Sequence, residues 1–286
     1  MNAIRKDFSR SPDVRLSYLD WNAPSNQCVV CLHGLGDHGL VWQQFAAFVV
    51  GHGYRCIAPD LRGHGESSQP PETEYGADAI AADLAQLADA LNLEAVDVIA
   101  HSWAAKVALV WARRQPGRVR SLVLVDPFFV NRFAGWWKLT FPLLYRVLPF
   151  LKVMGPFDSY EAAEGVARGL KQYRGWSELQ AQVFREGMRQ TSQGQWVSKF
   201  SVAARNGVFD DTLRLAGLTE RLETRTCLVL PQDGLNQRAF QLKPYEQYLS
   251  ALTTVKVPGN HWPHLVEPAA FGRAVLDFLE GVEAKA

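Results

Sequence analysis

Short apolar segments alternate with longer amphipathic ones along most of this chain, and this alternation restricts the fold more than any other feature. Residues 27–33 (QCVVCLH) and 54–59 (YRCIAP) are largely apolar, as expected for strands buried on both faces of a parallel sheet. Further strands are predicted over 15–21, 95–100, 119–126, 226–231 and 253–258. Apolar residues spaced three and four apart predict helices over 39–52, 77–92, 103–115, 238–250 and 266–280. The pattern indicates an α/β fold with a mainly parallel sheet.

One long segment interrupts this order. Residues 127–220 are helical in pattern, contain no good strand and separate two predicted strands. We therefore predict a core formed by residues 1–126 and 221–286, with residues 127–220 as a helical cap over the carboxyl edge of the sheet. The first part of the cap is rich in aromatic residues, and its charged residues are all positive: Arg132, Lys138, Arg146 and Lys152.

The aromatic residues of the cap have three possible uses. They can line an apolar substrate pocket, rest transiently on a membrane surface, or pack the small core of the cap itself. Our candidates for substrate contact are Phe128, Trp136 and Trp137. All three uses remain open from the sequence.

Charge and composition exclude several classes of protein. The 30 Lys and Arg residues balance 29 Asp and Glu residues, so no strong positive field is available to attract nucleic acid. No stretch of eighteen apolar residues is present, and the N-terminal residues lack the apolar segment of a secretory signal. The default location is therefore cytoplasmic. The sequence leaves the oligomeric state open.

The four cysteines do not form a recognisable metal or redox motif. Cys28 and Cys31 are three residues apart on a predicted strand, so their side chains should point to opposite faces and pack in the core. We find neither metal-ligand spacing nor a glycine-rich phosphate loop, so no metal or cofactor is implied.

The first candidate for chemistry is Ser102, between a predicted strand and a predicted helix. A serine on such a sharp turn has its hydroxyl exposed above the sheet, and the residues two positions before and after it must be small. Ala100 and Ala104 meet this requirement. The context favours Ser102 as a nucleophile over a helix-capping serine.

A serine that attacks a carbonyl carbon creates an oxyanion, which needs N–H donors held in place. The segment His33-Gly34-Leu35-Gly36-Asp37 ends a predicted strand and contains a glycine turn. We predict that the backbone N–H groups of Leu35 and Trp103 supply the two donors.

A serine hydroxyl also needs a nearby base at neutral pH. The loop after the last predicted strand contains His261 and His264. We predict that His261 reaches Ser102, whereas His264, where the final helix begins, is structural. His101, next to the serine, should point down from the turn and pack.

These segments together resemble the α/β-hydrolases that use a serine nucleophile and carry a helical cap. HGLGDH resembles the oxyanion motif of the family, DLRGHGES a characteristic turn, AHSWAA the nucleophile turn and GNHWPHLVEPAAF the histidine loop, in the family's order. The resemblance covers residues 15 to 280. It implies a mostly parallel eight-stranded sheet flanked by helices, with the cap inserted after the sixth strand. Within DLRGHGES, Asp60, Arg62 and His64 are expected to brace the loop.

The family also implies an acid that orients the histidine, and two residues compete for this role. Asp233 follows the first strand after the cap, although about one residue early, and Asp126 ends the strand before the cap, where some relatives carry their acid. We favour Asp233 over Asp126.

The predicted activity is hydrolysis of a carboxylic ester with an apolar acyl or alcohol group. Relatives that open epoxides or cleave carbon–halogen bonds carry a carboxylate where Ser102 stands, which disfavours those reactions. Two alternatives remain. One is cleavage of a carbon–carbon bond beside a ketone, as in similar capped relatives with acidic dienoate substrates. The other is a catalytically disabled, ligand-binding protein.

Overall fold

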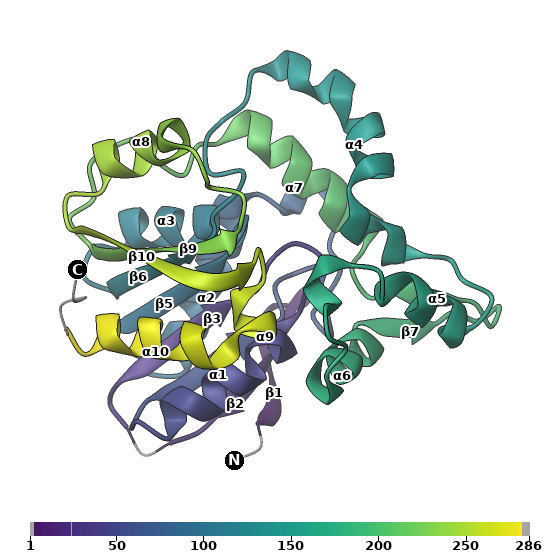
Figure 1. The fold of residues 1–286 in the computed structure, drawn as a ribbon, viewed down its shortest axis with the longest axis horizontal. Helices are drawn as coiled ribbons and strands as arrows, with labels where there is room; N and C mark the ends of the chain where they lie inside the picture. Colours follow the sequence, from purple (N-terminus) through teal and green to yellow (C-terminus); the bar gives the residue numbers. More distant parts are fainter. Residues whose placement is uncertain (1–2, 24, 282–286) are drawn as a thin grey trace.

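The computed structural model describes residues 3–23 and 25–281; residues 1–2, 24 and 282–286, which our predicted core includes, lie outside the described residues (Figure 1). An eight-stranded mixed sheet has the order β1-β2-β4-β3-β5-β6-β9-β10. The strands from β4 to β10 in this order run parallel, and β1 and β2 are antiparallel to their neighbours. The strands are β1 (Ile4–Ser11), β2 (Val14–Trp21), β3 (Cys28–Leu32), β4 (Arg55–Pro59), β5 (Val96–His101), β6 (Val119–Val125), β9 (Arg225–Asp233) and β10 (Leu252–Asn260). The predicted fold class is confirmed.

The edge strand β1 is the one sheet strand whose position we did not predict. Its sequence, IRKDFSRS, is mostly polar, and its residues alternate only between exposed and half-buried. An edge strand with one partner has little apolar surface to bury, so it gives a weak sequence pattern.

Helices cover both faces of the sheet and enclose two apolar clusters (Figure 1). One face carries α2 (Ala77–Ala90), α3 (Ala104–Arg114) and α8 (Ala239–Tyr248); the other carries η1 (Gly39–Trp42), α1 (Gln43–Val50), α9 (Pro263–Val266) and α10 (Pro268–Leu279). Cys28 packs in the first cluster and Cys31 in the second. The prediction that these cysteines point to opposite faces is confirmed.

A helical insertion separates β6 from β9, as predicted. It contains η3 (Gly135–Thr140), α4 (Phe141–Val147), η4 (Pro149–Met154), α5 (Tyr160–Ala167), η5 (Lys171–Tyr173), α6 (Glu178–Glu186) and α7 (Val202–Arg214). Our prediction that it contains no strand was wrong, because β7 (Met188–Gln190) pairs with β8 (Trp196–Ser198). Three residues are too few to show a period of two in the sequence. Among the described residues, no helix is long and apolar enough to cross a membrane.

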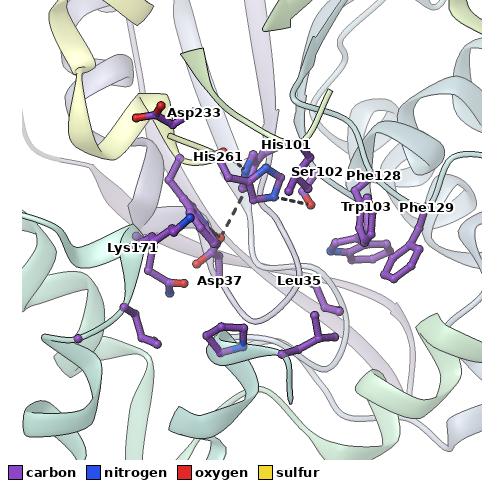
Figure 2. A pocket seen from close by; sticks show the side chains of 17 residues that line it. Leu35, Asp37, His101, Ser102, Trp103, Phe128, Phe129, Lys171, Asp233 and His261 are labelled. Carbon is purple, nitrogen blue, oxygen red and sulfur yellow. Dashed lines mark hydrogen bonds and ion pairs between the residues drawn. The ribbon is translucent and has the colours of Figure 1, made fainter. Parts of the chain in front are cut away.

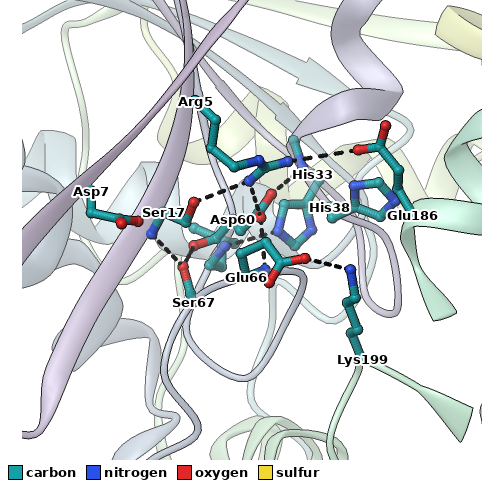
Figure 3. A network of polar contacts seen from close by, with 12 residues as sticks. Arg5, Asp7, Ser17, His33, His38, Asp60, Glu66, Ser67, Glu186 and Lys199 are labelled. Carbon is teal, nitrogen blue, oxygen red and sulfur yellow. Dashed lines mark hydrogen bonds and ion pairs between the residues drawn. The ribbon is translucent and has the colours of Figure 1, made fainter. Parts of the chain in front are cut away.

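The turn after β4 is braced by buried charged residues, as predicted. Asp60 accepts hydrogen bonds from the backbone N–H of Gly39 at 2.7 Å and of Glu66 at 2.9 Å, and the Arg5 guanidinium lies 2.9 Å from its carboxylate (Figure 3). Arg62 forms two 2.7 Å hydrogen bonds with Asp83 of α2. The ring of His64 is fully buried, stacked on Phe200 and Trp103. These contacts hold the turn after β4 in place. The short helix η2 (Glu72–Glu74) follows on the same loop.

Candidate active site

Ser102 lies on a sharp turn between β5 and α3. Its φ of 58° falls in the left-handed region, which a serine rarely adopts, and its backbone N–H donates to the carbonyl of Val125 at the end of β6 (3.0 Å). Ala100 and Ala104 are both fully buried, so neither position has room for a larger side chain. The strained turn holds the Ser102 hydroxyl above the carboxyl edge of the sheet.

The structure brings His261 next to this hydroxyl. His261 follows β10, and its Nε2 lies 3.0 Å from Oγ of Ser102 (Figure 2). The preceding Asn260 fixes the loop: its side-chain amide donates to the carbonyl of Lys171, and its side-chain oxygen accepts from the N–H of Trp262. In this arrangement the Ser102 hydroxyl donates to the imidazole, which is the geometry a base requires.

The other imidazole nitrogen contacts Asp126. Nδ1 of His261 lies 2.6 Å from Oδ2 of Asp126, a fully buried residue at the end of β6 with a φ of 40°. The carboxylate also accepts from the backbone N–H groups of Leu235 (2.8 Å) and Asn236 (3.2 Å) and from the Asn236 side-chain amide (2.8 Å). These donors stabilise the charged carboxylate in a buried place and orient it toward His261.

This geometry corrects our choice of acid. Asp233, which we favoured, is the last residue of β9 and is exposed, and Figure 2 shows its carboxylate directed away from His261. β6 and β9 are paired neighbours, so both strands end at the same edge of the sheet. The loop after Asp233 donates its N–H groups to Asp126, and no hydrogen bond joins Asp233 to His261 among the described residues.

Gly234 provides a test of this arrangement. A Cβ at this position would lie 2.7 Å from Oδ2 of Asp126, closer than real Cβ contacts. We therefore expect Gly234→Ala to displace the carboxylate and to lower the kcat/KM for an ester by about 10- to 100-fold, since small displacements in an active site cost that much.

Steady-state kinetics would check this, with Gly165→Ala as the matched control. A Cβ on Gly165 meets nothing within 4 Å. A wild-type value of kcat/KM in Gly234→Ala would show that ester hydrolysis does not depend on the position of the Asp126 carboxylate.

The two predicted oxyanion donors both line the cavity that contains Ser102. Neither the Leu35 nor the Trp103 backbone N–H donates a hydrogen bond to any other described residue. Because Gly34 has no Cβ, the turn can lie close to the ring of His101; a Cβ at this position would lie 2.5 Å from Nδ1 of His101. Two backbone N–H groups without a hydrogen-bond acceptor among the described residues thus belong to the wall of the cavity that contains Ser102.

The other two histidines of the site pack, as we predicted. His101 is buried, and its Nε2–H donates to the backbone carbonyl of His261 at 2.7 Å, so it supports the loop that holds the imidazole. His264 is fully buried and stacks on Trp42 with 4.4 Å between ring centroids. Burial lowers the pKa of His264 to about 3, so this ring is neutral at physiological pH.

A cavity of about 430 Å³ lies above Ser102, between the core and the insertion. Its walls are mainly apolar and include Leu35, Trp103, Phe128, Phe129, Leu148, Pro149, Leu170 and Trp262. Polar side chains at its surface are those of Asp37, Lys171, Gln172 and Asp233, besides Ser102 and the histidines. Phe129, Leu148 and Lys171 were not among our sequence candidates, because no local pattern distinguishes them from ordinary packing or surface residues.

Of the three predicted substrate contacts, only Phe128 lines this cavity. Trp136 is 63% exposed on the outside of the insertion, and Trp137 stacks on Phe133 with 5.0 Å between ring centroids. Our prediction for these two tryptophans was wrong, because the helical run that carries them directs one side chain outward and the other into the packing of the insertion.

Asp37 is a buried carboxyl group in the cavity wall. Burial raises its pKa from the ordinary value of 3.8 to about 7, although the Trp262 indole donates to its Oδ2 at 3.1 Å, which acts in the opposite direction. A second titratable group lies close by, since Nδ1 of His101 is 3.8 Å from Oδ2 of Asp37. Burial, followed by the nearby rings of His261 and His264, lowers the pKa of His101 well below its usual value, so this ring adds no compensating charge.

The raised pKa of Asp37 predicts that the stability of the folded protein depends on pH. Between pH 4 and pH 7 the folded protein binds more protons at Asp37 than the unfolded chain does, so the free energy of unfolding falls as pH rises through this window. Asp37→Asn removes the titration and retains an acceptor for Trp262. We expect the variant to gain up to about 4 kcal/mol relative to wild type as the pH rises from 4 to 7, at about 1.4 kcal/mol per pKa unit.

Urea unfolding of both proteins across this pH range measures the difference. A constant difference between variant and wild type from pH 4 to pH 8 would contradict a buried carboxyl group that titrates near 7.

Comparison with known proteins agrees with the fold. A model of the alpha/beta hydrolase fold family matches residues 27–268. The chain belongs to this family. Among the described residues of this α/β-hydrolase, no group of three or more His, Cys, Asp or Glu side chains is arranged to hold a metal ion.

Similar proteins within the family have different activities. A 2-hydroxy-6-oxo-2,4-heptadienoate hydrolase of Pseudomonas putida is 36% identical over 262 residues, which cover 88% of each chain. Epoxide hydrolase 2 of Siraitia grosvenorii is 37% identical, but only over 38% of this α/β-hydrolase and 34% of its own length. This α/β-hydrolase aligns with five of its relatives, that epoxide hydrolase included, over only 33% to 42% of their lengths. A thioesterase domain from the curacin biosynthetic pathway has the same fold, with a TM-score of 0.79 at 22% identity over 96% of this chain and 100% of its own.

Proposed function

We propose that this α/β-hydrolase is a serine hydrolase that cleaves carboxylic esters with an apolar acyl or alcohol group through an acyl-enzyme. The observation that carries the proposal is the chain of contacts from Ser102 to His261 (3.0 Å) and from His261 to Asp126 (2.6 Å). A hydroxyl, an imidazole and a buried carboxylate in this order are the components of nucleophilic catalysis by serine.

In the first half of the reaction, Oγ of Ser102 attacks the ester carbonyl carbon and its proton passes to Nε2 of His261. The carbonyl oxygen becomes an oxyanion, which accepts hydrogen bonds from the N–H groups of Leu35 and Trp103. The tetrahedral intermediate collapses, the bond to the alcohol oxygen breaks, and His261 returns the proton to the leaving alcohol. Asp126 holds the imidazole in the required tautomer and stabilises its positive charge.

In the second half, water replaces the alcohol. His261 accepts a proton from the water molecule as its oxygen attacks the acyl carbon, and the same two N–H groups stabilise the second oxyanion. The bond to Ser102 then breaks, the proton returns to Oγ, and the carboxylic acid leaves.

The walls of the cavity support an apolar substrate. Aromatic and aliphatic side chains from both the core and the insertion surround Ser102, and burying apolar area contributes about 25 cal/mol per Å². Lys171 is the one cation of the described cavity wall, and it shares the space with Asp37 and Asp233. The Asp233 carboxylate, and Asp37 where it is ionised, would oppose an acidic substrate, which favours a neutral ester.

Hydrolysis of p-nitrophenyl esters with acyl chains of increasing length tests the proposal. We expect kcat/KM to rise with acyl length until the cavity is filled and then to fall. Absence of hydrolysis at every length, with folded protein, would count against an esterase.

Cleavage of a carbon–carbon bond is the second candidate. It is supported by the identity over 88% of the chain with the Pseudomonas putida hydrolase and by the Lys171 ammonium group, which could bind a substrate carboxylate. The coloured product of aromatic ring fission distinguishes the two. Its cleavage is followed as a loss of absorbance. A higher kcat/KM for this substrate than for any p-nitrophenyl ester would favour this second activity.

A further inference from the structure

The outer face of the insertion carries an unusual row of exposed apolar side chains. Elements η3 and α4 form one helical run, and four of its apolar residues are highly exposed: Trp136 (63%), Leu139 (85%), Leu143 (62%) and Val147 (54%). Their spacing of three, four and four residues places them on one side of a helix. We call these four residues the cap stripe. Figure 1 shows the run at the outer edge of the molecule, above α7 and away from the sheet.

The opposite side of the same run is covered by the protein. Phe141 is buried with its ring 5.2 Å from that of Phe209, and Trp137, Leu144 and Tyr145 pack on the same cluster. The run therefore carries apolar side chains on two sides, although only one of these sides has a partner. A surface helix normally places polar residues on its outer face, so exposed apolar residues in a row mark an interaction surface.

The charges of the segment that carries the stripe indicate the kind of partner. Residues 127–157 contain four cations and no Asp or Glu. Lys138 pairs with Asp210 of α7 at 3.1 Å, but no ion pair joins Arg132, Arg146 or Lys152 to another described residue. A second copy packed symmetrically on this face would bring these cations together, which is unfavourable. Anionic lipid headgroups complement them, at about 1 kcal/mol per Lys or Arg near the surface.

We propose that the cap stripe docks on an anionic lipid surface. Trp136 suits the headgroup boundary, and Leu139, Leu143 and Val147 enter the outer acyl region, with Arg132, Arg146 and Lys152 against the phosphates.

The helical run joins the cavity at both ends, since Phe128 and Phe129 precede it and Leu148 and Pro149 follow it. An apolar ester dissolved in the bilayer would thus enter beside the docked helix. This direction of entry, unlike the docking itself, rests on the proposed function.

Vesicle sedimentation with the full chain tests the docking. We expect wild type to bind vesicles of two parts phosphatidylcholine to one part phosphatidylserine at least about tenfold more tightly than phosphatidylcholine alone, since three unpaired cations face the lipid. Leu139→Gln/Leu143→Gln should weaken this binding by about tenfold or more, because each buried CH₂ contributes about 0.8 kcal/mol. Arg146→Gln/Lys152→Gln should remove most of the preference for phosphatidylserine.

The matched control is Ile4→Gln/Val202→Gln, which changes two exposed apolar residues outside the stripe (56% and 55%) and should bind as wild type does. Absence of binding to either vesicle, or equal binding by the stripe variant and wild type, would overturn the proposal. The proposal would also be overturned if the protein formed a dimer that the stripe substitutions dissociate, while its binding to vesicles did not change. Hydrolysis of a water-soluble ester by the stripe variant reports on the proposed function separately, and Ser102→Ala should sediment with vesicles as wild type does.

Discussion

Ser102→Ala is expected to lower the kcat/KM for an ester by about a million-fold, since loss of a serine nucleophile removes the whole covalent pathway. Any remaining rate would come from substrate binding and the oxyanion donors alone. Steady-state assays with the best p-nitrophenyl ester measure the effect. The substitution removes one oxygen from a small, buried residue, so thermal unfolding should change little.

Ser192→Ala is the matched control, because Ser192 is exposed in the turn between β7 and β8. It should retain wild-type kinetics. Hydrolysis by Ser102→Ala within tenfold of wild type would mean that another group performs the chemistry.

Asp126→Asn is expected to lower kcat by about ten-thousand-fold, the loss seen when the acid of a serine triad becomes an amide. The introduced amide could place an N–H group against Nδ1 of His261, where the carboxylate now accepts the Nδ1–H. This favours the wrong imidazole tautomer. It also leaves the protonated ring without a counter-charge. The size of the side chain is preserved, and circular dichroism would verify that the variant folds.

Asp233→Asn is the matched control for this substitution. Its carboxylate lies at the cavity wall but makes no contact with His261, so we expect less than about a tenfold change in kcat. A large loss in Asp233→Asn with little effect in Asp126→Asn would show that the acid is the one we favoured from the sequence, and that the loops rearrange during catalysis.

The sequence was sufficient to predict the positions of Ser102 and His261 but not that of the acid. Each of the first two lies in a local motif at the end of a strand, and parallel strands bring such ends to one edge of the sheet. The acid depends on contacts between loops. Asp126 and Asp233 end neighbouring strands, and the choice between them follows from the donors of Leu235 and Asn236.

A weak signal for this choice was present in the sequence. Gly234 follows Asp233 directly and Asn236 follows Leu235, and they provide a residue without a side chain and an amide donor beside a carboxylate. The carboxylate that accepts from the Asn236 side chain, however, is that of Asp126, 110 residues away in the chain. Local periodicity contains no information about such a contact.

The insertion was predictable in outline only. Its helices follow from spacing, but the aromatic residues of its first part divide among three surroundings that the sequence does not separate. Phe128 faces the cavity, Trp137 packs inside the insertion, and Trp136 faces outward. These differences arise from how η3 lies on α7, a tertiary contact that hydrophobicity alone does not specify.

Labelling with a fluorophosphonate, followed by peptide mass spectrometry, tests the central claim most directly. The reagent reacts with a serine only where a base removes its proton and donors hold the developing charge. We predict one adduct, on the peptide that contains Ser102, formed rapidly in wild type and in Asp233→Asn and far more slowly in Asp126→Asn. A folded wild-type protein that stays unlabelled, or an adduct on a different serine, would contradict the account.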